Sequence, residues 1–208
     1  MANSDNPPNH DQKEDLKICG VVLTGGNSIR FGKDKSNARF EGRSFLEHSI
    51  EKLRPLCNEV YISVGTMVVE NEMELPYVKI MDTEGFEGPL AGILASFQGL
   101  KADYLYVLAV DLPIISASSL FNLKAVVSDN LTKPPPVLVL ASQESSGRVQ
   151  PLAGLWHHSL AESLVKYLAS GKRSVMGFID AYSPILFAVP DRELSNINFP
   201  EDLSDISG

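Results

Sequence analysis

The sequence predicts a three-layer α/β fold with a mostly parallel central sheet, and two apolar segments carry this prediction. Residues Ile18–Leu23 form an uninterrupted apolar run, which is typical of a strand buried on both faces. Residues 104–110 form a second such run, and helical patterns separate the strand-like segments along the chain. The length of 208 residues suits one domain of this class with a sizeable core.

The expected strands and helices alternate along the chain. Strands are expected at 18–23, 60–64, 78–81, 104–110, 137–141, 150–156 and 185–189, and helices at 44–56, 89–101, 116–128 and 158–169. Ser44 is predicted to cap the first helix, and Pro89 stands near the first turn of the second, where its missing N–H does no harm. Residues 1–16 are polar and are expected to form a disordered tail ahead of a single domain at 17–208.

The composition argues against several classes of protein. A formal net charge of −8 disfavours a nucleic-acid partner, although it allows a local basic pocket. No apolar run reaches about 18 residues, so no membrane span is expected. The amino terminus also lacks the apolar core of a signal peptide. Cys19 and Cys57 show no pairing pattern, which predicts buried thiols and a cytoplasmic location.

The segment that follows the first strand has the chemistry of a polyphosphate site. Residues 23–35 read Leu-Thr-Gly-Gly-Asn-Ser-Ile-Arg-Phe-Gly-Lys-Asp-Lys. Gly25 and Gly26 have no Cβ, so the backbone can come close to a bound group. Arg30 and Lys35 supply positive charge directly afterwards. A glycine-rich turn with solvated charges is the alternative interpretation.

This loop fits neither of the two common phosphate-binding patterns. A P-loop that ended at Lys33 would need a glycine at position 27 and a hydroxyl residue at position 34, which are Asn27 and Asp34. A dinucleotide fingerprint needs spaced glycines, whereas the glycines here are adjacent. The pattern therefore argues against kinase-like and dehydrogenase-like functions.

Two aspartates stand where expected strands end. Asp111 follows the strand at 104–110, and an ionised carboxylate beside so apolar a run is costly unless a positive group pairs with it. Mg²⁺ is a natural partner, because it is usually held by one or two carboxylates together with substrate phosphates. A turn or helix-cap role ahead of Pro113 is an equal alternative. For Asp82, a turn residue is the better interpretation in isolation.

The loop at 23–35 is similar to the signature of nucleotidyltransferases, Leu-x-Gly-Gly-x-x-x-Arg-(Met/Phe)-Gly-x-x-Lys, and it resembles the molybdenum cofactor guanylyltransferase family in particular. Three further segments resemble blocks of that family in the same order: 87–93 (Glu-Gly-Pro-Leu-Ala-Gly-Ile), 150–155 (Gln-Pro-Leu-Ala-Gly-Leu) and 196–202 (Asn-Ile-Asn-Phe-Pro-Glu-Asp). The resemblance implies a Rossmann-like nucleotidyltransferase fold, with a nucleotide-binding amino half and a pterin-binding carboxyl half.

The resemblance also implies a role for each matching residue. The nucleotide pocket would be lined by Leu23, Thr24 and Gly25, with Gly26 beside them, and Ser63 and Asp82 would lie near the base and ribose. Arg30 and Lys35 would offset phosphate charge, and Asp111 would bind Mg²⁺. Arg173 would meet the pterin phosphate, and Asn198 would be a second contact to the metal or phosphates. A solvated helix terminus for Arg173 and a helix cap for Asn198 are equal alternatives.

Two positions depart from the family pattern. Thr24 replaces the usual alanine, which leaves a main-chain role intact. Ser63 stands where relatives often carry an asparagine for base recognition, and its shorter hydroxyl would reach the base through a water. The pair Gly25-Gly26 is typical of guanine users, whereas related cytidylyltransferases carry Ala-Gly.

The implied reaction is nucleotidyl transfer. The terminal phosphate of molybdopterin, with or without molybdenum, would attack the α-phosphorus of Mg·GTP, and pyrophosphate would leave. A phosphate monoester is already ionised near neutral pH, so no general base is required. Proteins that deliver the cofactor or mature molybdoenzymes are expected partners. Two alternatives stay open: a nucleotidyltransferase that uses CTP or UTP, and a non-catalytic nucleotide-binding protein of the same fold.

Overall fold

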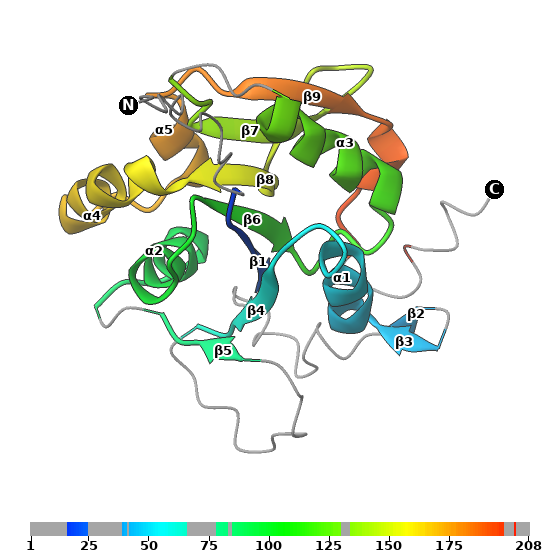
Figure 1. The fold of residues 1–208 in the computed structure, drawn as a ribbon, viewed down its shortest axis with the longest axis horizontal. Coiled ribbons are helices and arrows are strands. Elements are labelled where there is room, and N and C mark those ends of the chain that lie inside the picture. The colour runs from blue at the N-terminus through cyan, green and yellow to red at the C-terminus, as the bar shows by residue number, and fades with distance from the viewer. Residues whose placement is uncertain are drawn as a thin grey trace, which may run out of the picture.

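A seven-stranded sheet forms the centre of the molecule, with helices on both of its faces (Figure 1). The computed structural model describes residues 16–24, 39–40, 42–65, 78–82, 85–129, 134–197 and 202. The strands are arranged in the order β5-β4-β1-β6-β8-β7-β9. They are β1 (Ile18–Leu23), β4 (Glu59–Ser63), β5 (Lys79–Ile80), β6 (Tyr104–Ala109), β7 (Leu138–Gln143), β8 (Val149–His157) and β9 (Ile185–Val189).

Within this sheet, β8 runs in the opposite direction to both of its neighbours. It pairs antiparallel with β6 and with β7. The other pairings, β1 with β4 and β6, β4 with β5, and β7 with β9, are all parallel. The predicted three-layer fold with a mostly parallel sheet is therefore confirmed. Because β8 is reversed, its beginning lies at the edge where the other strands end.

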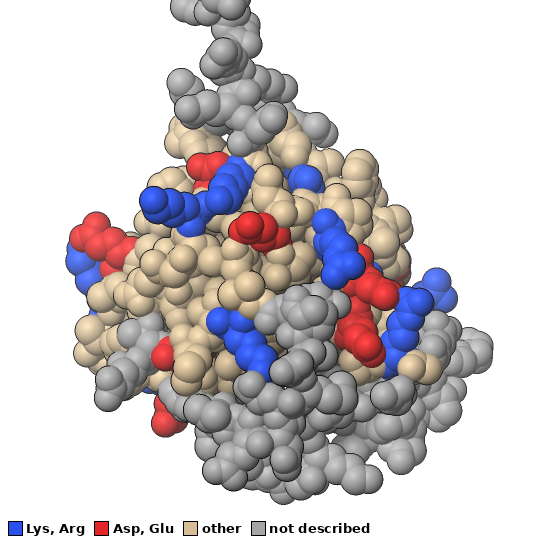
Figure 2. Space-filling model, turned by 60° about the horizontal axis from the view of Figure 1, so that its bottom comes forward, with Lys and Arg blue, Asp and Glu red and all other residues tan. Residues whose placement is uncertain are grey.

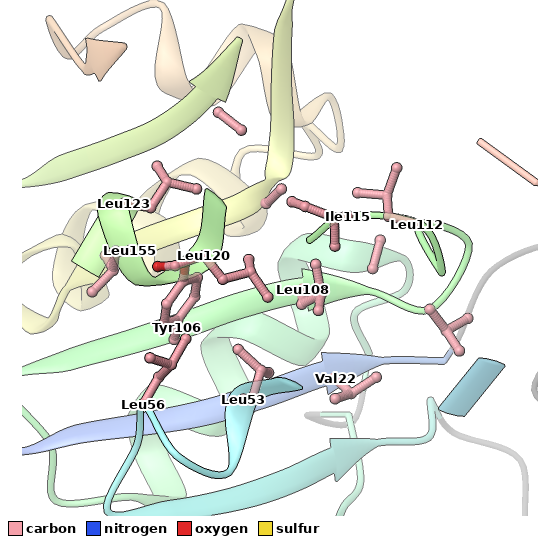
Figure 3. Close-up of a cluster of buried hydrophobic side chains, with 14 of the residues drawn as sticks. Val22, Leu53, Leu56, Tyr106, Leu108, Leu112, Ile115, Leu120, Leu123 and Leu155 are labelled. Atoms are coloured by element: carbon pink, nitrogen blue, oxygen red, sulfur yellow. The ribbon is translucent and has the colours of Figure 1, made fainter. Parts of the chain in front are cut away.

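The helices cover two separate hydrophobic clusters, one on each face of the sheet. Helices α1 (Phe45–Leu53) and α3 (Ala117–Asp129) pack on the first cluster, part of which is drawn in Figure 3. Helices α2 (Pro89–Gly99), α4 (Ala161–Ala169) and α5 (Val175–Ile179) pack on the second. Successive residues of β1 point to opposite faces, so Val21 belongs to the second cluster and Val22 to the first.

Several predicted boundaries agree with the structure. Ser44 caps α1, since its Oγ accepts from the Glu47 N–H (3.2 Å) while its own N–H donates to Glu47 Oε2 (2.7 Å). The helix ends at Leu53, ahead of Pro55, and is therefore shorter than the predicted 44–56. The predicted helix at 158–169 divides into the 3₁₀ helix η3 (His158–Leu160) and α4.

The structure also contains short elements that the sequence did not predict. They are the hairpin of β2 (Arg39–Phe40) and β3 (Arg43–Ser44), helix α5, and the 3₁₀ helix η4 (Asp191–Leu194). The expected tail lies almost entirely outside the described residues, because residues 1–15 are not among them. No helix in the described ranges is long and apolar enough to cross a membrane.

Candidate functional site

The predicted site residues follow neighbouring strands at one edge of the sheet. β1, β4, β5 and β6 run in the same direction, so their carboxyl ends meet at this edge. Leu23 ends β1 and is followed by Thr24, Ser63 ends β4, Asp82 follows β5, and Asp111 follows β6. In open α/β sheets, ligands bind outside the carboxyl ends of the strands. The fold thus brings together residues that are far apart in the sequence.

Ser63 forms hydrogen bonds both to the residue that follows β1 and to a residue that follows β5. Its carbonyl accepts hydrogen bonds from the Thr24 N–H (3.0 Å) and the Thr24 hydroxyl (2.8 Å). Its own hydroxyl donates to Asp82 Oδ1 over a longer distance of 3.4 Å. Because position 24 is threonine instead of the usual alanine, its hydroxyl adds a hydrogen bond to the end of β4. Ser63 is buried there, with 3% of its surface exposed.

Asp82 is partly withdrawn from solvent beside Ser63. Its N–H donates to the Gly65 carbonyl at 3.3 Å, which fixes the backbone after β5 to the end of β4. Burial raises the pKa of the Asp82 carboxyl above its ordinary value, and the hydrogen bond from Ser63 partly opposes that rise. The two side chains thus form one polar unit, in which the pKa of Asp82 depends on Ser63 as well as on burial.

Gly92 in α2 makes room for this polar unit. A Cβ at position 92 would lie 2.3 Å from Ser63 Oγ, 3.2 Å from Asp82 Oδ1 and 3.3 Å from Leu23 Cδ2. Gly92 falls within the 87–93 block but was not among the predicted site residues. A lone glycine inside a helical pattern is the signal that could have found it, because it often marks a close approach.

Asp111 begins a loop that joins β6 to α3, residues 111–116, which we call the Asp111 loop. The N–H of Val110 donates to the Leu23 carbonyl (3.1 Å), so the end of β6 is tied to the end of β1. Leu112 and Ile115 have no exposed side-chain surface and pack in the first hydrophobic cluster (Figure 3). Asp111 itself is partly exposed. A buried anchor therefore holds a partly exposed aspartate at the end of β6.

The donor chemistry of Asp111 fits a magnesium ion. Over the ranges that the structure describes, no group of three or more His, Cys, Asp and Glu residues could hold a metal. Mg²⁺ needs fewer protein ligands, because it keeps several waters and binds through one or two carboxylates together with substrate phosphates. One partly exposed carboxylate at the end of a strand matches that donor set.

Arg173 makes contacts of a different kind. Its Nη1 donates to the carbonyls of Leu168 (2.7 Å) and Lys172 (2.8 Å), and its guanidinium lies 5.6 Å from the centroid of the Phe86 ring. The first bond satisfies a carbonyl in the last turn of α4, as a cation near a helix carboxyl terminus commonly does. The contact with a pterin phosphate stays a prediction.

The other predicted site residues lie outside the described part of the chain, and their roles stay predictions. They are Gly25, Gly26, Arg30, Lys35 and Asn198. On the face drawn in Figure 2, the described Lys and Arg side chains lie interspersed with Asp and Glu. The described surface there presents no broad field of one sign.

The fold and the family model together define a protein of the nucleotidyltransferase class. The family model of the MobA-like NTP transferase domain matches residues 20–185. The chain belongs to this family, and its relatives place it among the molybdenum cofactor guanylyltransferases.

Several relatives match nearly the whole chain, and two of them show the extent of the match. A protein of Chloroflexus aggregans named probable molybdenum cofactor guanylyltransferase is 30% identical over 205 residues, which cover 90% of this chain and 92% of that protein. The molybdenum cofactor guanylyltransferase of Shewanella sp. strain MR-4 is 30% identical over 190 residues, covering 89% of this chain and 93% of that protein.

Solved structures agree in fold. The molybdopterin-guanine dinucleotide biosynthesis protein A of Archaeoglobus fulgidus has a TM-score of 0.68 at 20% identity, covering 90% of this chain and 96% of that one. The 2-C-methyl-D-erythritol 4-phosphate cytidylyltransferase of Thermus thermophilus has a TM-score of 0.58 at 18% identity, with coverages of 89% and 95%. At these identities the likeness shows the fold alone.

Proposed function

We propose that this protein transfers the GMP moiety of GTP to molybdopterin or the molybdenum cofactor, which forms the guanine dinucleotide cofactor and releases pyrophosphate. The observation that carries the proposal is the meeting of Thr24, Ser63, Asp82 and Asp111 at one sheet edge, in a chain of the guanylyltransferase family. The amino half supplies this edge. The carboxyl half is proposed to bind the pterin.

Ser63 and Asp82 form the base and ribose side of the proposed site. A carboxylate is an acceptor of hydrogen bonds, so Asp82 suits the donor groups of guanine or the ribose hydroxyls. Ser63 reaches Asp82 with its hydroxyl and holds Thr24 with its carbonyl. Leu23 and Thr24, which are followed by the glycine pair, would present main-chain groups to the nucleotide.

Asp111 is proposed to hold Mg²⁺. When bound, Mg²⁺ neutralises phosphate charge and stabilises the oxygens that exchange at phosphorus. The chain itself positions the reactants and offsets charge, with Arg30 and Lys35 on the phosphates. No side chain needs to remove a proton, because the attacking phosphate is already ionised near neutral pH.

Lys35→Ala is expected to weaken GTP binding about tenfold and to lower the rate, because one charge-assisted bond to the phosphates is lost. Isothermal titration with GTP measures the affinity. Lys166→Ala is the matched control: Lys166 is exposed and pairs across a helix turn with Glu162 (2.6 Å), so its loss should leave GTP binding unchanged. Equal affinities in the two variants would remove the phosphate role of Lys35.

Ser63→Ala is expected to shift the pH dependence of GTP binding to higher pH. If ionised Asp82 accepts hydrogen bonds from the nucleotide, GTP affinity falls as the pH drops through the pKa of Asp82. The Ser63 hydroxyl lowers that pKa, so its removal raises the pKa and the loss of affinity begins at a higher pH. GTP titrations over a pH series measure the shift. Asp82→Asn should abolish this pH dependence; an unchanged profile in Ser63→Ala contradicts the coupling.

The decisive test of function is pyrophosphate release by the purified protein with molybdopterin, Mg²⁺ and each of GTP, CTP and UTP. We expect pyrophosphate release in the mixture that contains GTP and no release in those that contain CTP or UTP. Preference for CTP or UTP would favour a related nucleotidyltransferase. Nucleotide binding without release in any of the mixtures would favour a non-catalytic protein of the same fold.

We also propose a cytoplasmic location and partners that deliver the cofactor or receive the product. Cys19 and Cys57 are free thiols. Burial raises the pKa of Cys57 to about 12, so this thiol stays protonated and unreactive. Two unpaired thiols suit a reducing compartment. Fractionation of cells with an antibody against the protein tests the location.

A further inference from the structure

The segment at residues 191–197 lies against the Asp111 loop. We call it the strap; it begins with η4 (Asp191–Leu194) and continues to Ile197. Leu194 and Ile197 are 5% and 1% exposed, and both belong to the hydrophobic cluster that contains Leu112 and Ile115. The strap and the Asp111 loop therefore share one buried anchor.

The strap bonds both ends of the Asp111 loop. The Ile197 N–H donates to the carbonyl of Asp111 at 2.8 Å. Glu193 Oε2 accepts from the N–H of Ser116, also at 2.8 Å. Ser116 in turn begins α3, because its Oγ accepts from the Ser119 N–H at 3.0 Å. One bond thus holds the residue that carries the carboxylate, and the other holds the residue that begins the next helix.

Other elements hold the middle of the loop and the strap itself. Lys52 of α1 donates from Nζ to the Pro113 carbonyl. Gln150, at the start of β8, donates from Nε2 to Asn196 Oδ1 at 3.1 Å. Backbone groups of the Asp111 loop therefore have partners outside the loop at its beginning, middle and end. Loops that carry function gain their precision from rigid supports of this kind.

Two carboxylates of η4 point to different partners. Glu193 reaches the Asp111 loop, as described. Asp191 Oδ1 accepts from the Ser145 N–H at 3.0 Å, and its Oδ2 accepts from the Ser145 hydroxyl, in the turn between β7 and β8. The same short helix thus bonds two separate loops through residues of the same chemistry. Loss of either carboxylate removes a side-chain bond to a backbone N–H, but only Glu193 bonds the loop that begins with Asp111.

We propose that Glu193 is a positioning residue for the metal site, since it fixes the Asp111 loop through Ser116 while Ile197 fixes Asp111 itself. The inference rests on the proposed function, because it takes Asp111 as the ligand of the divalent cation. Mg²⁺ tolerates little departure from octahedral geometry, so the direction of a ligating carboxylate matters. Loss of groups that orient a metal ligand typically lowers metal affinity about 10- to 100-fold.

The test is a titration of Mn²⁺ followed by electron paramagnetic resonance, with the full chain and the α,β-methylene analogue of GTP. Glu193→Ala is expected to weaken Mn²⁺ binding about tenfold. Glu193→Gln should restore most of the affinity, because its amide oxygen can still accept from Ser116. Asp191→Ala, the matched control, should bind Mn²⁺ as the unchanged protein does. Hydrogen exchange of the Ser116 amide should accelerate in Glu193→Ala and stay slow in Asp191→Ala.

The outcomes distinguish the positioning role of Glu193 from the metal-binding role of Asp111. Unchanged Mn²⁺ affinity in Glu193→Ala, together with loss of affinity in Asp111→Ala, overturns the role of the strap and leaves the metal role of Asp111 intact. Equal weakening in Glu193→Ala and Asp191→Ala also overturns it, because a general loosening of η4 would then account for both. Unchanged affinity in Asp111→Ala overturns the metal role of Asp111 and the strap inference together.

Discussion

Asp111→Ala is expected to lower the rate of pyrophosphate release at least about 100-fold, which corresponds to about 3 kcal/mol of lost stabilisation of the transition state. The loss is expected because Asp111 is the carboxylate that we propose to hold Mg²⁺. The fold should survive, since Leu112 and Ile115 anchor the loop from within the core and Asp111 is only partly buried. Steady-state kinetics and a thermal melt measure the two effects.

Asp103 offers a matched control at the other end of the same strand. It precedes β6, and its Oδ2 accepts from the Lys17 N–H at 2.8 Å, at the edge opposite to the site. Asp103→Ala should therefore keep wild-type turnover per folded molecule, even if the melting temperature drops. Turnover in Asp111→Ala that matched that of Asp103→Ala would contradict the metal assignment.

Gly92→Ala is expected to raise the KM for GTP about tenfold, equivalent to about 1.4 kcal/mol of binding free energy. The added methyl would stand 2.3 Å from Ser63 Oγ, so the hydroxyl must move. Rotation of Ser63 breaks its bond to Asp82, and Asp82 Oδ1 is itself only 3.2 Å from the new atom. The collision falls on side-chain tips rather than on backbone, so the damage should be to the site and not to the fold.

Two other glycines show how specific this effect should be. Gly99 ends the same helix, and a Cβ there would meet nothing within 4 Å, so Gly99→Ala should leave the KM unchanged. A Cβ at Gly154 would lie 2.1 Å from the Val139 carbonyl oxygen, so Gly154→Ala should lower the stability of the sheet. An unchanged KM in Gly92→Ala would show that Ser63 and Asp82 do not contact the nucleotide.

The sequence alone predicts the bounds of an element where a single physical signal dominates. β1 and β9 have the predicted bounds, because their apolar runs end at polar or breaking residues. Ser44 was recognisable as a cap from local chemistry alone. Helix α5 and the 3₁₀ helix η4 were missed, because elements of one turn are too short to show a hydrophobic period.

The candidate site shows the same division. Ser63, Asp82 and Asp111 could be predicted from the resemblance to the family. For the two aspartates, their place after strands that end at a common edge added to that prediction. Gly92 left one signal, a lone glycine inside a helical pattern, but its close approach to Ser63 could not be inferred from that signal. Glu193 could not be predicted, because its significance lies in a hydrogen bond to Ser116 in another part of the chain. Tertiary contacts of this kind leave no periodic trace in a single sequence.

The reversed direction of β8 has a consequence for how the chain folds during synthesis. β6 pairs with β1 on one side and with β8 on the other, and all six of its residues are buried in the finished protein. A nascent chain that has made β1, β4, β5 and β6 therefore exposes a long apolar edge, which is a template for aggregation. The hairpin of β7 and β8 covers that edge when Leu108 meets Ala153 and Tyr104 meets His157. The four strands whose carboxyl ends carry the candidate site can therefore pair before β8 is made, but the lateral edge of β6 is covered only once residues 149–157 have emerged from the ribosome.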